Sequence, residues 1–352
     1  MAETSFVRRR WKLIVNVITI VALVVLIVAI RGQLETTFRN LFKVHAWALL
    51  LIIPAEFLNY DAQARLYQGL FSITGNRLGY WRLFKASLEL NFVNGVFPSG
   101  GVTGISYFGV RMRDSDITVA KATVVHLLKL VLLVLSFEVL IVFGLFCLAI
   151  EGRMNSIILL VAGMLTTVLV IGTGGFAFII GSEKRIAGFF TWATRVLNRM
   201  LAPFRRGRSD AINVERARLL FEDLHANYML IRRDKQKLKW PFFWALMANF
   251  WEVAAVYVVY IAFGNLVNFG AVILAYAVAN FAGLVSILPG GVGIYEGLMT
   301  LVLSATGVPS SLSLPVTVMY RVLNTLIQLP PGYYFYHKTL HTAKKPTQLD
   351  AA

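Results

Sequence analysis

Charged residues and cysteine are both scarce in this chain of 352 residues. Charged side chains make up 15% of it, against about 25% in a typical soluble protein, while 57% of the residues are hydrophobic. That is too little polar side chain to cover a water-soluble globule, which excludes a soluble enzyme. Cys147 is the sole cysteine and lies within an apolar run, which excludes a secreted module built on disulfide bonds.

Acidic residues are also few, with 18 Asp and Glu against 34 Lys and Arg and a net charge of +16. In a soluble protein such an excess suggests nucleic-acid binding, whereas in a membrane protein it gathers in cytoplasmic loops. Because the chain is so apolar, we interpret it as an all-α polytopic membrane protein that does not bind nucleic acid.

Six apolar stretches are long enough, or nearly so, to cross a bilayer as helices, which takes about 20 residues. They are residues 13–30, 44–62, 117–150, 155–181, 241–263 and 316–337. Two further apolar regions, 80–112 and 266–308, are interrupted by Pro98-Ser99-Gly100-Gly101 and by Pro289-Gly290-Gly291. We expect both to be re-entrant helical hairpins, because too few residues follow Pro98 to complete a crossing. Whether 266–288 spans fully stays open, since it is long enough to do so.

The basic residues predict the orientation of the chain. The segments assigned to the cytoplasm are 1–12, 61–85, 111–116, 182–240 and 338–352, and they hold 27 Lys and Arg, while segments 31–43 and 151–154 on the outer side hold 4. This bias predicts a multi-pass protein of the cytoplasmic (cell) membrane with both termini in the cytoplasm. Within the basic connector 182–240, apolar residues from Ile186 to Met200 predict an amphipathic helix on anionic lipid.

Two parts of the chain share an order of features. The stretches NFVNGVFPSGGVTG (91–104) and NFAGLVSILPGGVG (280–293) both run from Asn-Phe through a proline to a glycine pair. Each broken region lies between a span with a glutamate and a span with a basic residue: Glu56 and Lys129 in the first case, Glu252 and Arg321 in the second. The alternative is chance, because an apolar chain with 27 glycines matches glycine pairs easily.

The two units would cross the membrane in opposite directions. Repeat one covers about 41–150 and repeat two about 241–337, within a single transmembrane domain of residues 1–352. We therefore predict about six full spans plus two re-entrant hairpins in an inverted-topology repeat, an architecture typical of secondary transporters.

Chain breaks at membrane depth are candidates for a binding site. Irregular backbone survives there only when it is buried in protein or lines a polar cavity. A helix that starts after each break would direct free N–H groups and a partial positive charge toward the bilayer centre, which favours an anionic headgroup. Close packing at the small-residue spacings Gly100–Gly104 and Gly293–Gly297 is the alternative.

Ionisable residues within spans are functional candidates as well, because their burial in lipid is costly. Lys129 and Arg321 could hold a phosphate, and nearby carboxylates could neutralise them or carry a coupling proton. Buried ion pairs and side chains that reach the interface are the alternative, and for His126 we favour a structural role. The expected substrate-binding residues are Asn91, Pro98, Gly100, Gly101, Gly104, Lys129, Asn280, Pro289, Gly290, Gly291, Gly293, Glu296 and Arg321, and the charge-coupling candidates are Glu56, Glu138 and Glu252.

The sequence contains no catalytic, metal-binding or cofactor-binding motif. Its five histidines are scattered, and Cys147 has no partner. Asp114 and Asp116 have a spacing that could bind a divalent ion, but beside Arg111 and Arg113 they are more typical of a solvated turn. We therefore expect no metal and no cofactor.

A family resemblance rests on the second broken region. The stretch FAGLVSILPGGVGIYEGLMTLVLSATGVP (281–309), with Arg321 and the Pro-Pro-Gly that ends at Gly332, resembles the lysylphosphatidylglycerol synthase transmembrane region, a flippase-like family of integral membrane proteins. The first broken region fits the same family, and the resemblance covers roughly residues 40–340. Its most specific part is Pro289, Gly290, Gly291, Gly293 and Glu296.

The resemblance implies a lipid-handling protein, in some members a flippase for aminoacylated phosphatidylglycerol. Other members act beside polyprenyl-phosphate sugar pathways. We expect no aminoacyl transfer, because this chain lacks the soluble synthase domain. Our leading hypothesis is a flippase or transporter that moves an anionic phospholipid or polyprenyl-phosphate lipid through a central cavity between the paired hairpins.

Two alternatives stay open. One is a membrane enzyme that acts on a polyprenyl-linked sugar or phosphate, with Asp114, Asp116 and Glu296 as its chemical groups. The other is a non-transporting partner of a lipid synthase. The sequence also leaves open the identity of the lipid, the direction of movement, the coupling ion and whether the protein forms a homo-oligomer.

Overall fold

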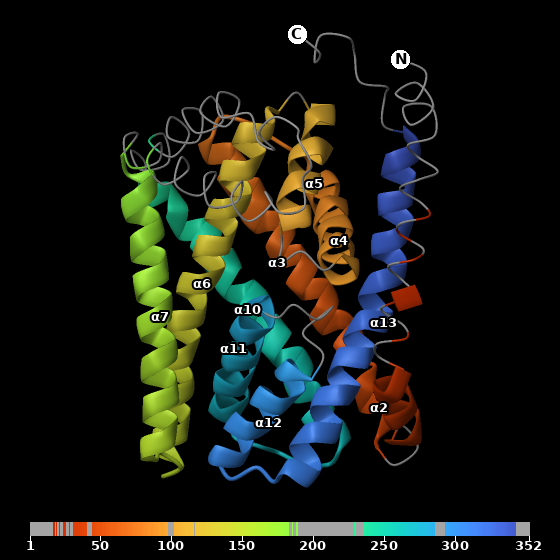
Figure 1. Cartoon of the computed structure of the whole chain (residues 1–352), viewed down its shortest axis with the longest axis vertical. Helices are drawn as coiled ribbons and strands as arrows, with labels where there is room; N and C mark the ends of the chain where they lie inside the picture. The colour runs from red at the N-terminus through yellow and green to blue at the C-terminus, as the bar shows by residue number, and fades with distance from the viewer. Residues whose placement is uncertain are drawn as a thin grey trace, which may run out of the picture.

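Helices joined by short turns make up the described part of the chain, which contains no strand (Figure 1). The computed structural model describes residues 31–40, 44–97, 102–115, 117–182, 235–285 and 293–342, with isolated positions between 17 and 28 and between 185 and 229. The expected all-α class is confirmed. The first expected span, both Pro-Gly breaks, Asp116 and the amphipathic helix of the connector lie outside the described residues.

The helices differ widely in length. The long ones are α3 (Ile52–Ile73), α6 (Val119–Ile150), α7 (Ser156–Ile180), α10 (Lys239–Ala262) and α13 (Ser310–Thr342). The shorter ones are α2 (Ala46–Leu49), α4 (Tyr80–Val96), α5 (Val102–Met112), α11 (Phe269–Val285) and α12 (Ile294–Ala305), with 3-10 turns at Arg113–Ser115 and Lys235–Leu238. Residues 31–40 are helical as well.

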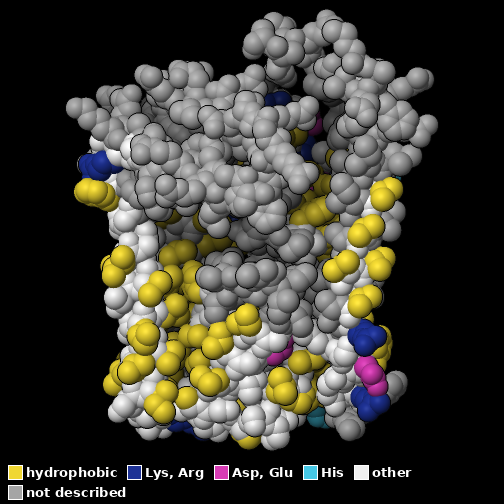
Figure 2. Space-filling view, in the orientation of Figure 1, with side chains coloured by type: hydrophobic (Ala, Val, Ile, Leu, Met, Phe, Trp, Pro, Cys, Tyr) yellow, Lys and Arg dark blue, Asp and Glu magenta, His cyan; other side chains and the backbone are white. Residues whose placement is uncertain are grey.

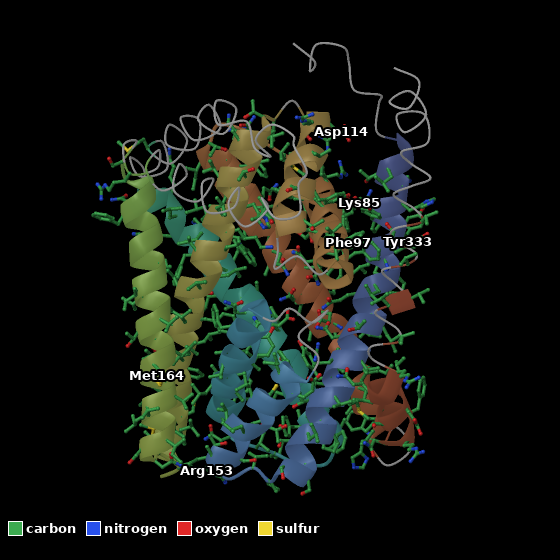
Figure 3. All side chains as sticks on the ribbon, viewed as in Figure 1. Lys85, Phe97, Asp114, Arg153, Met164 and Tyr333 are labelled. Atoms are coloured by element: carbon green, nitrogen blue, oxygen red, sulfur yellow. The ribbon has the colours of Figure 1, made fainter. Side chains whose placement is uncertain are left out.

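Two pairs of shorter helices lie in opposite halves of the molecule. Helices α4 and α5 pack together in the upper half of Figure 1, and α11 and α12 pack together in the lower half. Figure 3 places Asp114, just after α5, at the upper end and Arg153 at the lower end. Phe97, which directly follows α4, lies between these levels. Neither pair therefore extends over the full height of the molecule.

Three described helices are long and apolar enough to cross a membrane, namely Val119–Ile150, Ser156–Gly175 and Gln236–Ala262. Helices α3 and α13, with 22 and 33 residues, have the length but not the apolar composition. Both were expected to be spans. Their polar side chains contact neighbouring helices, as described below, so a helix inside the bundle needs less apolar surface than one that faces lipid.

Helix α3 continues well past residue 62, where the apolar run was expected to end. The reason is local. Asp61 and Arg65 form an ion pair one turn apart, with Oδ2 and Nε separated by 2.8 Å, while Leu66 and Tyr67 are fully buried. Polar residues on the outer face thus interrupt the apolar run in the sequence without ending the helix.

The packing of the helices is reciprocal. Helix α3 packs against α10, while α4 packs against α13 and α11 packs against α6. Buried apolar side chains form one large cluster around α10, α11 and α12 and a second around α3, α4 and α5. Hydrophobic side chains also cover much of the described surface in Figure 2. Val142, Leu160 and Val168, for example, are each at least 60% exposed. Such an apolar surface is typical of a protein that is surrounded by lipid.

Helices α6 and α11 approach each other backbone to backbone at Gly144 and Gly270. A Cβ atom added at Gly270 would lie 2.1 Å from the carbonyl oxygen of Gly144. Only residues without a side chain permit this approach, which is a common device between membrane helices.

Replacing Gly270 by alanine is expected to lower the melting temperature, because the backbone of α6 cannot move aside and overpacking costs about 1–3 kcal/mol. Gly163→Ala on α7 is the matched control, since a Cβ there meets no atom within 4 Å. Alanine favours the helix at such an open position, so this control should be neutral or stabilising. Thermal unfolding in detergent measures both variants, and an equal response would contradict the close-contact interpretation.

Candidate functional site

A stripe of polar side chains runs along one face of α13. Tyr320, Asn324 and Gln328 follow one another at four-residue spacing, which places them on the same side of a helix. The Asn324 Nδ2 atom donates to the Tyr320 hydroxyl at 3.2 Å, and the Gln328 Nε2 atom donates to Asn324 Oδ1. Helix α13 thus carries a continuous hydrogen-bonded row into the interior.

One end of this row connects to the first half of the chain. Gln328 Nε2 donates to Glu56 Oε2 on α3 at 2.9 Å, and Gln328 Oε1 accepts from Asn91 Nδ2 on α4. Asn91 also donates to the Tyr60 hydroxyl at 2.6 Å. Glu56 is only 1% exposed, and its second oxygen, Oε1, has no hydrogen-bond partner among the described residues. The structure therefore brings together two predicted residues, Glu56 and Asn91.

The other end of the row reaches α10 and α11. The Tyr320 hydroxyl donates to Glu252 Oε1 at 3.1 Å, and Tyr276 also hydrogen-bonds Glu252. Five helices thus contribute to a single set of hydrogen-bonded groups. We call this set the central network: Glu56, Tyr60, Asn91, Glu252, Tyr276, Tyr320, Asn324 and Gln328.

Lys129 lies on α6 beside the central network. Its Nζ atom donates to Gln63 Oε1 at 2.7 Å and lies 4.6 Å from the centre of the Tyr67 ring. Gln63 in turn donates to Asn59 Oδ1 at 2.7 Å. The Lys129 charge interacts electrostatically with Glu252, although no ion pair joins the two in the described part of the chain. Lys129 is thus a buried cation that interacts with the network through Glu252.

Glu296 caps helix α12 and binds Arg321. Its Oε2 atom accepts from the backbone N–H of Gly293 at 2.6 Å, while Oε1 accepts from Arg321 Nη1 and from Gln33 Nε2, the latter at 2.8 Å. Gly293 has a φ of +88°, which favours glycine at this position. The guanidinium of Arg321 lies 4.9 Å from the centre of the Tyr295 ring. Three predicted residues, Gly293, Glu296 and Arg321, therefore form one cluster.

The other predicted residues that the structure describes form no hydrogen bond with these two groups among the described residues. A Cβ at Gly104 would lie 2.1 Å from Asn94 Oδ1, which agrees with a packing role. Asn280 is partly buried on α11, and Glu138 on α6 has a buried oxygen, Oε1, without a described partner. His126 is buried against the Tyr67 hydroxyl, with 2.6 Å between its Nδ1 atom and the oxygen. The predicted residues Pro98, Gly100, Gly101, Pro289, Gly290 and Gly291 lie outside the described residues.

Sequence reasoning missed most of the neutral members of the network. Tyr60, Tyr276, Tyr320, Asn324 and Gln328 were not singled out, because the search ranked intramembrane residues by charge. The four-residue spacing of Tyr320, Asn324 and Gln328 was the available signal. A second missed group surrounds the buried Glu89, which accepts hydrogen bonds from Arg111, Tyr107 and Thr339 at 2.8, 2.7 and 3.0 Å.

An all-helical body with membrane-length apolar helices and ionisable groups buried among them defines a polytopic membrane protein. The chain belongs to the lysylphosphatidylglycerol synthase TM region family, whose model matches residues 13–332. A UPF0104 membrane protein of Methanothermobacter thermautotrophicus is 25% identical over 321 residues, which cover 88% of this chain and 90% of that protein. Another, from Pyrococcus horikoshii, is 20% identical over 236 residues, 66% of this chain and 69% of that protein. The family resemblance of the sequence is confirmed.

The Glu296–Arg321 pair should respond to mutation as a unit. Glu296→Gln keeps a capping acceptor, so it isolates the loss of charge. We expect Glu296→Gln and Arg321→Gln each to cost about 3 kcal/mol, because each removes one half of the ion pair, and the double variant to cost less than the sum. Thermal unfolding of the four proteins in detergent gives the comparison. Strictly additive effects would show that the two charges do not stabilise each other.

Proposed function

We propose that this protein moves an anionic lipid, of the phospholipid or polyprenyl-phosphate type, across the cell membrane, with the headgroup bound at the central network. One observation carries the proposal: side chains from five helices form a hydrogen-bonded network with two carboxylates inside an otherwise apolar helical body. Ionisable groups at such depth are costly and mark substrate or ion pathways.

The architecture of the proposed transporter is an inverted repeat. Helices α3 to α6 form one unit and α10 to α13 the other, with α4–α5 and α11–α12 as re-entrant hairpins from opposite sides. Three observations support this. The helix pairs lie in opposite halves of Figure 1, and their packing is equivalent, since α4 contacts α13 as α11 contacts α6. The first helix of each unit also contributes one carboxylate, Glu56 or Glu252. Such repeats place the substrate site where the two units meet.

Two cations beside the network would receive the phosphate. Arg321 now binds Glu296, and Lys129 now binds Gln63. An arriving phosphate would replace these partners, while Glu296 would keep its hydrogen bond to the Gly293 backbone. Binding by exchange of partners avoids an uncompensated charge before the lipid arrives or after it leaves. This allows the headgroup both to enter the site and to leave it.

The proposed transport also fits the placement of the acidic residues better than catalysis does. Asp114 is half exposed at the upper end of the molecule, whereas Glu296 lies on α12 in the lower half (Figures 1 and 3). These two groups therefore do not share a site. Among the described residues, no group of three or more His, Cys, Asp or Glu side chains could hold a metal ion.

The proposed topology predicts opposite sidedness for Asp114 and Arg153. Both side chains are close to half exposed, so cysteines placed there in a Cys147→Ala background should react with a maleimide. A membrane-impermeant maleimide added to intact cells should label the Arg153→Cys protein alone, because positive-inside bias places Asp114 in the cytoplasm. Inside-out vesicles should reverse the result. Labelling of both variants from one side would refute the inverted arrangement.

Lipid movement is tested with purified protein in liposomes that contain fluorescent phosphatidylglycerol. The protein should accelerate its transbilayer movement, measured by dithionite quenching of the outer leaflet. Gln328→Leu should slow this movement about tenfold or more, because it removes one hydrogen-bond partner from Glu56 and one from Asn91, and each lost buried hydrogen bond costs about 1–3 kcal/mol.

The matched control for Gln328→Leu is Gln68→Leu on α3. Gln68 is exposed, and in the described part of the chain its side chain donates to the backbone oxygen of Leu78 at 3.3 Å, outside the central network. This variant should move lipid at the rate of the unmodified protein. Equal rates in protein-free liposomes, for phosphatidylglycerol and for a polyprenyl-phosphate probe, would refute the proposed function.

A further inference from the structure

The carboxyl group of Glu56 is almost fully buried but only half satisfied by hydrogen bonds. The residue is 1% exposed, and only its Oε2 atom accepts a hydrogen bond, from Gln328. Its Oε1 atom is buried without a partner in the described ranges. Leaving a buried carboxylate oxygen unpaired is costly, so this oxygen is suited to bind a positively charged ligand.

The neighbouring amides cannot supply the missing hydrogen bond. The Gln328 amide donates to Glu56 Oε2 and to Asn324 Oδ1, which uses both of its N–H groups. The Asn91 amide donates to Tyr60 and to Gln328, which uses both of its own. Both neighbouring amides are thus already engaged, and Oε1 has no hydrogen-bond partner in the described ranges.

The charges of the network do not balance. When ionised, Glu56 and Glu252 carry two negative charges, and Lys129 carries one positive charge that interacts with Glu252. Two other buried carboxylates are matched, since Glu296 binds Arg321 and Glu89 binds Arg111. One negative charge is left over, and buried charges in proteins are normally compensated.

No described cation occupies this position. Glu56 forms no ion pair within the described part of the chain, and the groups that interact with it electrostatically are Tyr60 on its own helix, Glu252 on α10, Tyr276 on α11 and Tyr320 on α13. Lys129 on α6 donates its hydrogen bond to Gln63 instead. These neighbours supply oxygen atoms and negative charge, and such surroundings favour the binding of a cation.

We propose that Glu56 binds one exchangeable monovalent cation, a proton or a sodium ion, and that this cation is coupled to lipid movement. The coupling rests on the proposed function, whereas the binding does not. With the cation bound, the network is neutral and can pass between its two orientations. Without it, the negative charge of Glu56 holds the network in place until another cation arrives. Anionic lipid and cation would then move together.

Binding is tested on purified protein in detergent, without lipid movement. Infrared difference spectra between acidic and neutral buffer report a proton through the carbonyl band of a protonated carboxyl group. Melting temperatures in sodium chloride against choline chloride report a sodium ion, because a ligand that binds the folded state raises its stability. One of the two signals is expected in the unmodified protein and should be lost in Glu56→Gln.

The matched control is Glu89→Gln. Glu89 is buried to the same 1% exposure, but both of its oxygens already have partners. This variant should keep the cation signal of Glu56. If Glu56→Gln does not fold, Glu252→Gln gives the second readout, since removal of the neighbouring negative charge should weaken cation binding about tenfold. Absence of both signals in the unmodified protein, or their persistence in Glu56→Gln, would overturn the site.

Coupling is tested in liposomes with a pH gradient at constant sodium and with a sodium gradient at constant pH. One gradient should accelerate movement of labelled phosphatidylglycerol severalfold, and Glu56→Gln should not respond. If the rate of lipid movement does not change with either gradient, the proposed coupling is wrong, although the proposed function stands. If no lipid moves under any condition, the proposed function fails, and the detergent measurement alone decides whether Glu56 binds a cation.

Discussion

A polar group inside this protein has only other parts of the same chain to bind, because the surrounding lipid offers no hydrogen bonds. This constraint explains how the helices are distributed. Helices α6 and α7 are the most apolar of the three membrane-length helices and expose much of their surface, whereas α3 and α13 contribute most of the polar residues of the central network. Gln328 shows the principle at a single residue, since it binds α3, α4 and its own helix at once.

Apolar runs and intramembrane charges in the sequence predict much of this arrangement of helices and polar residues. The interrupted region 80–112 becomes two helices separated near Pro98, and Asn91, Glu56 and Glu252 all join one network. These features are predictable because each depends on a local property, such as a missing backbone donor at proline or the cost of burying a carboxylate.

The features that could not be predicted depend on contacts between distant parts of the chain. Gln328 and Glu56 are 272 positions apart, so no local pattern reveals their hydrogen bond. Gly270 looks like any other glycine of an apolar helix until Gly144 is placed against it. The end of α3 was missed for a related reason, since Asp61 and Arg65 appear as an interruption unless the buried face of the helix is known.

The hydrogen bonds that join the two halves of the chain affect how the protein is made. Asn91 on α4 binds Gln328 on α13, which a ribosome adds 237 residues later, about 12–50 s later at ordinary synthesis rates. During this interval the amide of Asn91 and its neighbours on α4 lack their final partners. The insertion machinery therefore has to shelter the early half of the nascent chain until the late half arrives, and a truncated first half would be a substrate for membrane quality control.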